Sequence, residues 1–195
     1  LHPIHLFSTE VDEEETKFTS REEKFDYEAY KKLASHPKVI GIGECGLELF
    51  HLPPNANKKE ILEKQYEGFL GQYKLAKELD LPLVIHVRDA HPEMIELLKS
   101  LDAPIKGVVH CYTSNWEHAQ QYLDLGLYLG FTGVITFARS YDEVIKNAPL
   151  DRIMSETDCP YVPPAPYRGV RNEPLYVQEV VKKVAEIKGE SFERV

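Results

Sequence analysis

The 195-residue chain is long enough for one domain with a substantial hydrophobic core, or for two small domains. Its 43% hydrophobic and 28% charged residues are typical of a globular protein, and it has no apolar run of the roughly 18 residues that a membrane span needs. The net charge of −9 argues against a broad nucleic-acid-binding surface, because affinity for phosphates comes mainly from Lys and Arg. It does not exclude an enzyme that holds phosphates through bound divalent cations.

The first half of the chain predicts a strand followed by a long helix. The acidic run from Asp12 to Glu15 is expected to be a solvated loop or a helix start. Residues 39–43 then read as a buried strand, and a loop containing Pro53, Pro54 and Asn55 leads to a helix near residues 58–79. The apolar side chains of this helix recur at helical spacing and are Ile61, Leu62, Tyr66, Phe69, Leu70, Tyr73, Ala76 and Leu79.

The same alternation continues to the end of the chain. Apolar runs at 81–85, 107–109 and 127–131 read as strands, each followed by an amphipathic segment. Capping-box patterns at Ser114 with Glu117, and at Ser140 with Glu143, predict two helix starts. A last helix is expected near residues 173–188, with Gly189 as its C-cap.

Near-continuous apolar strands that alternate with helices predict an α/β protein whose parallel sheet is covered by helices. The chain holds about five strand–helix units, against the eight of a complete TIM barrel. We therefore predict a single domain over residues 1–195, formed by about the last five units of a TIM-type (β/α)8 barrel. Because the chain begins and ends abruptly, we expect N-terminal strands and a C-terminal helix in a longer protein.

Four polar side chains stand at or just after the ends of successive predicted strands: Glu44, His86, His110 and Asp158. A carboxylate or an imidazole is costly to bury unpaired. In a barrel, the carboxyl ends of all strands surround one active site. In an open sheet, ligands bind at a single crevice between strands. Four strands that each supply a ligand therefore fit the barrel better. Imidazole and carboxylate ligands suit Zn²⁺ or Mn²⁺, and harder oxygen ligands suit Mg²⁺. The sequence thus predicts a divalent metal site.

Cys45, Cys111 and Cys159 each directly follow one of these four predicted ligands. Because successive strand residues face opposite sides, we expect the thiols to pack among apolar side chains, with direct metal ligation as the alternative. Their odd number and wide spacing favour reduced thiols, so we expect an intracellular protein, either cytoplasmic or nuclear.

The segments around these residues are more specific than the ligands alone. In this order along the chain, they closely resemble the motifs of the TatD family of metal-dependent deoxyribonucleases, over nearly the whole chain from about residue 36. The segments concerned are 43–47, 82–88, 110–112, 131–137, 156–161 and 168–174.

The resemblance implies an amidohydrolase-type barrel that hydrolyses DNA phosphodiester bonds, with DNA ends as the expected substrate. It implies one or two divalent cations (Mg²⁺, Mn²⁺ or Zn²⁺) in each full-length chain. Glu44 would bridge two metals, and His86 and His110 would complete one of them. Asp158 would bind the other and orient or deprotonate the attacking water, so Asp158 and Glu44 are the expected catalytic residues. We expect DNA as the substrate, no membrane association and no obligate protein partner.

Three further residues are candidates for substrate binding. Arg88 contacts a phosphate or forms a salt bridge that orients the site. Tyr112 is a candidate for stacking on a base. Arg168, in a proline-rich loop, binds a phosphate or anchors that loop. Four other histidines are expected at the surface: His36, His51, His91 and His118.

The chain departs from the family pattern in two places. The family has a His-x-His motif on its first strand, whereas His2 and His5 are three apart here, and Glu48 stands where an Asp is usual. We expect Glu48 to pair locally, and we expect the 195-residue form to bind about one metal and to be poorly active. Two alternatives remain open: an amidohydrolase-type enzyme that acts on a small amide, lactone or phosphoester, and a non-catalytic barrel that lacks the His-x-His ligands.

Overall fold

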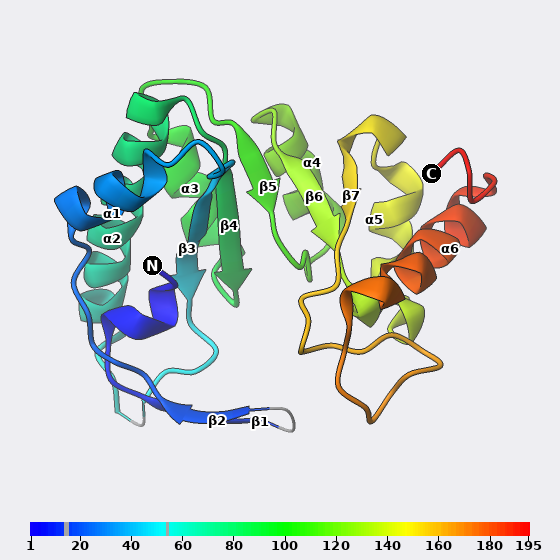
Figure 1. The fold of residues 1–195 in the computed structure, drawn as a ribbon, viewed down its shortest axis with the longest axis horizontal. Coiled ribbons are helices and arrows are strands. Elements are labelled where there is room, and N and C mark those ends of the chain that lie inside the picture. Colours follow the sequence, from blue (N-terminus) through cyan, green and yellow to red (C-terminus); the bar gives the residue numbers. More distant parts are fainter. Residues whose placement is uncertain (14–15, 54) are drawn as a thin grey trace. The chain divides into compact units, whose positions relative to one another are not determined.

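The structure is a computed structural model that describes residues 1–13, 16–53 and 55–195, so Glu14, Glu15 and Pro54 of the predicted loops lie outside the described residues. The chain forms two compact units, Leu1–Val108 (unit 1) and Val109–Val195 (unit 2), and each is described by itself. The single domain over residues 1–195 stays a prediction. Five strands, β3 to β7, alternate with helices along the chain in the predicted order (Figure 1).

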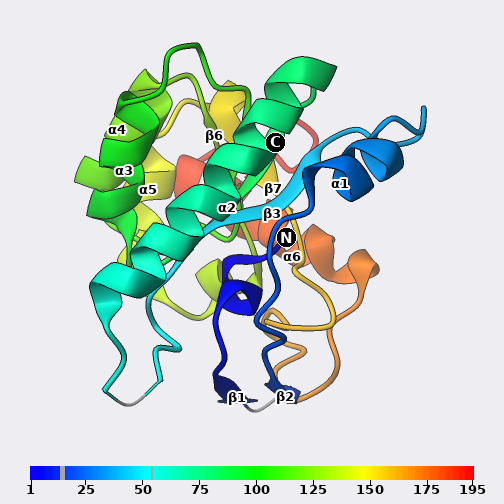
Figure 2. The same cartoon turned by 90° about the vertical axis from the view of Figure 1, so that its left-hand side faces the viewer.

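A parallel pair of strands, β3 (Ile42–Glu48) and β4 (Leu83–Arg88), forms the centre of unit 1. Its register sets Gly46 beside His86 and Glu48 beside Arg88. Gly46 has a φ of +148°, and a Cβ there would lie 1.9 Å from the carbonyl oxygen of His86, so glycine is required for this close approach. Helix α2 (Lys58–Leu79) packs against β3, as Figure 2 shows, and has the predicted bounds.

The remaining elements of unit 1 surround this strand pair. A short 3-10 helix, η1, contacts both β3 and α2, and an antiparallel hairpin follows it. Ile4, Phe7 and Val11 pack with Ile61 of α2 in a small core cluster. Asp12 belongs to the first hairpin strand rather than to the predicted loop or helix start. These elements are η1 (Pro3–Leu6), β1 (Glu10–Glu13), β2 (Thr16–Thr19), α1 (Tyr27–Ala34) and α3 (His91–Lys99).

The buried face of α2 differs from the predicted apolar stripe. Gln65 and Gln72 are buried, with 0% and 1% of their surfaces exposed, whereas Leu70 is 41% exposed. Both glutamines bind backbone groups of unit 1: Gln65 pairs with Glu48, and the Gln72 Nε2 donates to the carbonyl of Leu1 (3.1 Å). A buried amide is favourable when its hydrogen bonds are made.

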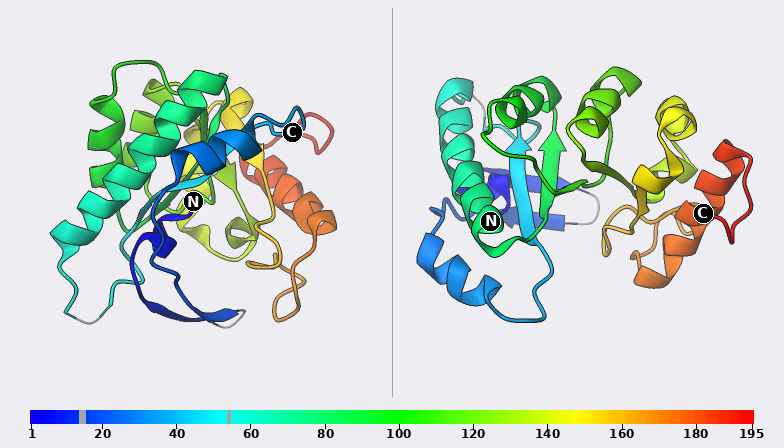
Figure 3. Two further views of the ribbon diagram at one scale, coloured as in Figure 1. Left: turned by 60° about the vertical axis from the view of Figure 1, so that its left-hand side comes forward. Right: turned by 90° about the horizontal axis from the view of Figure 1, so that it is seen from above.

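Unit 2 is built on the parallel pair β6 (Tyr128–Phe131) and β7 (Ile153–Ser155). Helix α6 contacts β7, α5 and the 3-10 helix η2, and Figure 3 shows α5 and α6 next to each other. The short strand β5 (Gly107–Val109) spans the boundary between the two units. The helical elements are α4 (Trp116–Asp124), η2 (Gly133–Thr136), η3 (Arg139–Tyr141), α5 (Asp142–Asn147), η4 (Leu150–Arg152), η5 (Pro174–Tyr176) and α6 (Val177–Lys188).

Several predicted element ends are wrong. Strand β3 begins at Ile42 rather than at residue 39, and Ile40 is 83% exposed. The side chain of Asn115, not of Ser114, caps α4, and no side chain caps α5. Helix α6 begins at Val177, later than predicted, although Gly189 caps its end with a φ of 69° as expected. None of the helices in the described part of the chain is both long and apolar enough to cross a bilayer.

Candidate metal centre

Strands β3 and β4 bring Glu44 and His86 together in unit 1. Both residues lie within their strands rather than after them, because pairing continues to Glu48 and Arg88. The Nδ1 atom of His86 is 3.6 Å from the Glu44 carboxylate. His2, which precedes η1, completes a group in which one donor atom from each residue lies within 4.8 Å of the others. His2 is a member of this group that the sequence did not predict.

The other nitrogen of His86 faces a buried carboxylate. Glu48 is 1% exposed, its Oε2 lies 3.3 Å from Nε2 of His86, and its Oε1 accepts from the backbone N–H groups of Phe50 and His51. Burial alone would raise the pKa of Glu48, but the hydrogen bond with His86 and the neighbouring donors lower this pKa to about 2. An ionised Glu48 only accepts, so Nε2 carries the proton and the Nδ1 lone pair points at Glu44.

This geometry fits a cation. Two acceptors, Nδ1 of His86 and the carboxylate of Glu44, face each other, and only a proton or a metal ion between them satisfies both. Burial alone would lower the pKa of His86, but hydrogen bonds to Glu44 and Glu48 outweigh it and raise this pKa. A divalent cation supplies the same positive charge. Imidazole and carboxylate are ligands that Zn²⁺ and Mn²⁺ accept.

His2 is placed differently from His86. Its Nδ1 accepts the backbone N–H of Ile4 at 3.1 Å, so the proton of the neutral ring sits on Nε2, 3.7 Å from the Glu44 carboxylate. Burial, together with the nearby His86, lowers the pKa of His2 to about 3 and keeps the ring neutral. In this tautomer the Nε2–H of His2 faces Glu44 beyond hydrogen-bond distance, and His2 can ligate a metal through Nε2 only if the proton leaves that atom.

Unit 2 repeats the arrangement of unit 1 around His110. His110 directly follows β5, and its Nε2 lies 3.3 Å from Oδ1 of Asp158. Its Nδ1 pairs with Oε2 of Glu156, whose other oxygen accepts the backbone N–H of Cys111 at 2.7 Å. Glu156 thus holds the proton on Nδ1 and leaves the Nε2 lone pair directed at Asp158. Two acceptors again face each other, as a cation site requires.

The structure therefore brings together Glu44 with His86 in unit 1, and His110 with Asp158 in unit 2. Glu156 was not predicted as a site residue. A signal for it exists, because Glu156 and Asp158 are two residues apart after β7, and alternate residues of an extended segment share a side.

The other histidines do not all lie at the surface. His91, at the start of α3, is buried with 6% exposed, and the His51 side chain is 11% exposed and lies 3.3 Å from Glu48. His118 is half-buried, with its Nδ1 2.8 Å from the Ser114 hydroxyl. The surface prediction is confirmed for His36 alone. Sequence periodicity did not reveal these positions, because each depends on contacts made after the chain folds.

The candidate substrate residues have different outcomes. Tyr112 is 1% exposed, its hydroxyl donates to the carbonyl of Asn115, and burial raises its pKa, so the prediction that it stacks on a base is wrong. The guanidinium of Arg88 lies 3.9 Å from the ring centroid of Phe50. Arg168 is exposed, donates to the carbonyl of Pro163 at 3.3 Å and covers a second aromatic ring, as the loop-anchor alternative expects.

The three thiols have different environments. Cys45 is 0% exposed, and burial raises the pKa of its thiol to about 12, which confirms apolar packing there. Cys111 and Cys159 are half-buried, and Cys111 lies 3.4 Å from the Thr132 hydroxyl. Packing as a buried apolar residue is therefore not the role of these two. All three thiols are free of disulfides.

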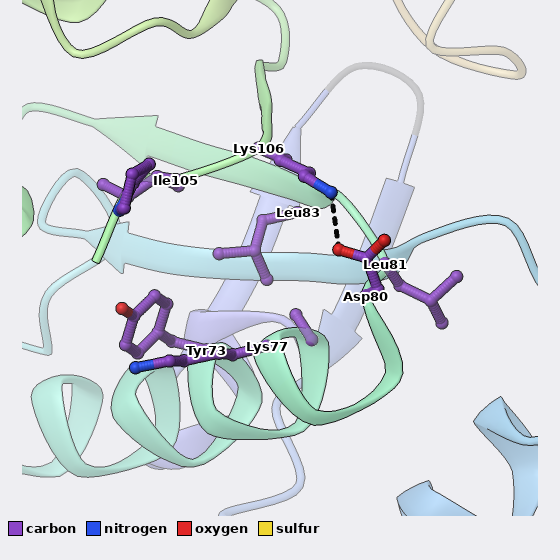
Figure 4. A pocket seen from close by; sticks show the side chains of 9 residues that line it. Tyr73, Lys77, Asp80, Leu81, Leu83, Ile105 and Lys106 are labelled. Atoms are coloured by element: carbon purple, nitrogen blue, oxygen red, sulfur yellow. Dashed lines mark hydrogen bonds and ion pairs between the residues drawn. The ribbon is translucent and has the colours of Figure 1, made fainter. Parts of the chain in front are cut away.

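A cavity of about 80 Å³ in unit 1 lies away from these residues (Figure 4). It is lined by Leu83 at the first position of β4, so it is at the opposite end of that strand from His86. Its lysines pair with carboxylates, Lys106 with Asp80 and Lys77 with Asp102. A small, largely apolar hollow with neutralised charges offers little to a phosphate, so the candidate site remains at the other strand end.

Comparison with known proteins identifies the family of the chain. The family model described as TatD related DNase matches residues 1–195. The metal-dependent hydrolase YabD of Bacillus subtilis is 42% identical over 168 residues, which are 85% of this chain and 64% of that protein. The 3'-5' ssDNA/RNA exonuclease TatD of Klebsiella pneumoniae is 37% identical over 171 residues, covering 84% and 63% of the two chains.

A solved structure shows the same fold. The crystal structure of YJJV, a TatD homolog from Escherichia coli, superposes with a TM-score of 0.76 at 30% identity, over 86% of this chain and 64% of that one. The chain thus spans about 64% of the length of these relatives. The predicted fold class, a TIM-type barrel represented by part of its strand–helix units, is confirmed. With a family match over all of its residues, the chain belongs to the family of TatD-related DNases.

Proposed function

We propose that the protein is a metal-dependent hydrolase that cleaves DNA phosphodiester bonds, with strand ends as its substrate. The observation that carries the proposal is the pairing found twice, in which an imidazole is paired with one carboxylate through one ring nitrogen and faces a second carboxylate with the other. Metal-ligating histidines in proteins have such outer carboxylate partners. Family membership supports the substrate class.

Glu44, His86, His110 and Asp158 would hold one or two divalent cations (Mg²⁺, Mn²⁺ or Zn²⁺). Such cations make water more acidic and offset the charge that develops on phosphate oxygens. Glu48 and Glu156 fix the tautomers of the two histidines, and His2 lies next to Glu44 as a further possible ligand through Nε2. Asp158, whose side chain is 27% exposed, orients the attacking water and accepts its proton.

Arg88 and Arg168 are the proposed contacts to substrate phosphates. Both rest on an aromatic ring, which holds the planar guanidinium in place, and a guanidinium presents several N–H donors in a fork that matches a phosphate. The net charge of −9 is consistent with contacts confined to one site and the bound cations. The free thiols favour a location inside the cell. We propose no membrane association and no obligate protein partner.

The test uses the full-length protein with end-labelled DNA and Mg²⁺ or Mn²⁺, with and without a chelator. We expect metal-dependent release of labelled ends, abolished by chelator and by Glu44→Gln or Asp158→Asn. A matched control is Glu63→Gln, which alters a carboxylate that is 65% exposed on α2. If DNA ends stay intact while small amides, lactones or phosphoesters are hydrolysed, the nuclease proposal is wrong and the alternative hydrolase function is favoured. Absence of any turnover and of metal binding would indicate a non-catalytic barrel.

A further inference from the structure

Asn172 is a buried polar residue that has no role in the site described so far. It is 2% exposed and lies in the segment between β7 and η5 of unit 2. The two N–H groups of its Nδ2 are shared among three backbone carbonyls, those of Thr157 (2.8 Å), Tyr161 (2.6 Å) and Val162 (3.2 Å). One side chain therefore binds the backbone at both ends of the short segment 157–162.

Further hydrogen bonds hold Asn172 itself. Its Oδ1 accepts the backbone N–H of Glu173 at 2.9 Å, and its own backbone N–H donates to the carbonyl of Pro160 at 3.1 Å. All of its side-chain polar atoms are thus used, as a buried amide requires. Gly133 closes the other side of the segment, because a Cβ at that glycine would lie 2.3 Å from the carbonyl of Val162.

Asp158 lies in this segment, residues 157–162. Asp158 has a φ of 56°, in the left-handed region that residues other than glycine rarely adopt. Its carbonyl accepts the backbone N–H of Tyr161 at 2.9 Å, while its carboxylate faces Nε2 of His110 at 3.3 Å. Such a conformation persists only when the surrounding contacts specify it. The backbone hydrogen bonds of Asn172 are contacts of this kind.

We propose that Asn172 is a positioning residue, which clamps residues 157–162 and so holds the carboxylate of Asp158 toward His110. It touches neither metal nor substrate, and it acts through the backbone on each side of Asp158. The expected effect on metal binding rests on the proposed function. The clamp itself rests only on the hydrogen bonds of Asn172.

The test compares Asn172→Ala and Asn172→Asp with Asn115→Ala in the full-length protein. Asn115 is a matched control, because its side chain also binds a backbone N–H in unit 2, that of His118 at 2.9 Å, and contributes to stability as a helix cap. Mn²⁺ binding is measured by calorimetry, and amide hydrogen exchange is followed across residues 157–162. We expect both Asn172 variants to weaken Mn²⁺ binding by about 10–100-fold and to speed exchange in this segment. Asn115→Ala should leave both unchanged.

A double-mutant cycle separates positioning from general loss of structure. If Asn172 acts through Asp158, Asn172→Ala adds no further weakening of Mn²⁺ binding in an Asp158→Ala background. Additive weakening, or wild-type binding and exchange in both Asn172 variants, overturns the inference. If Asp158→Ala binds Mn²⁺ like the wild type, the proposed metal role of Asp158 fails. The exchange experiment then still decides the clamp, because exchange does not depend on metal.

Discussion

Replacing Glu48 by Gln should weaken metal binding by reversing the tautomer of His86. Gln has nearly the same shape, and its carbonyl oxygen can keep the two backbone donors, Phe50 N and His51 N, that Oε1 accepts in the wild type. Its amide then faces Nε2 of His86 with a donor in place of an acceptor. Nε2 must accept, the proton moves to Nδ1, and the lone pair directed at Glu44 is lost.

The size of this effect follows from the contacts. Outer-carboxylate substitutions of metal-binding histidines cost about 10–100-fold in metal affinity, which is about 1.4–2.7 kcal/mol. Stability should fall by about 1 kcal/mol, because the backbone donors stay paired. Glu48→Ala differs, since it leaves two partly buried N–H groups without this acceptor, at about 1 kcal/mol each. The two variants therefore separate metal binding from stability.

Calorimetric titration of Zn²⁺ or Mn²⁺ into the wild type, Glu48→Gln and Glu48→Ala measures the first effect, and urea unfolding without metal measures the second. Glu63→Gln serves again as the exposed control and should change neither. If Glu48→Gln binds metal as tightly as the wild type, Glu48 does not set the tautomer of His86, and the ligand assignment in unit 1 is wrong.

Three further predictions concern residues that lie near the proposed ligands: Gln65, Gly133 and Cys45. Gln65→Leu should destabilise the protein by about 2–4 kcal/mol in urea unfolding, because the backbone N–H and C=O of Glu48 lose the buried side chain that binds both. A change below about 0.5 kcal/mol would contradict this explanation. Gly133→Ala should displace the carbonyl of Val162, which would lie 2.3 Å from the new Cβ, and should lower the melting temperature. An unchanged melting temperature would show that the loop shifts without cost. Cys45, fully buried with a thiol pKa of about 12, should resist iodoacetamide at pH 8 in the folded protein and react after unfolding, as mass spectrometry of its peptide would report. Rapid labelling in the folded state would show that unit 1 opens.

The amino-acid sequence by itself determined the alternation of strands and helices and the bounds of α2, and it supplied the four candidate metal ligands. These features are local. A helical repeat of apolar residues from 58 to 79, and polar side chains that follow apolar runs, are visible along the chain without knowledge of any distant contact. The resemblance to family motifs added the roles proposed for these four candidates.

Only the tertiary structure decided which groups support the donors. Gln65 binds the backbone of a residue 17 positions away, Glu48 orients a histidine 38 positions away, and Glu156 orients one 46 positions away. Gln65 and Glu48 are buried by such long-range contacts, and Tyr112 is buried against the rings of Tyr122 and Phe131. The sequence around a polar residue does not show which distant residue it will bind. Its burial becomes favourable only when folding brings a matching donor or acceptor within hydrogen-bond distance.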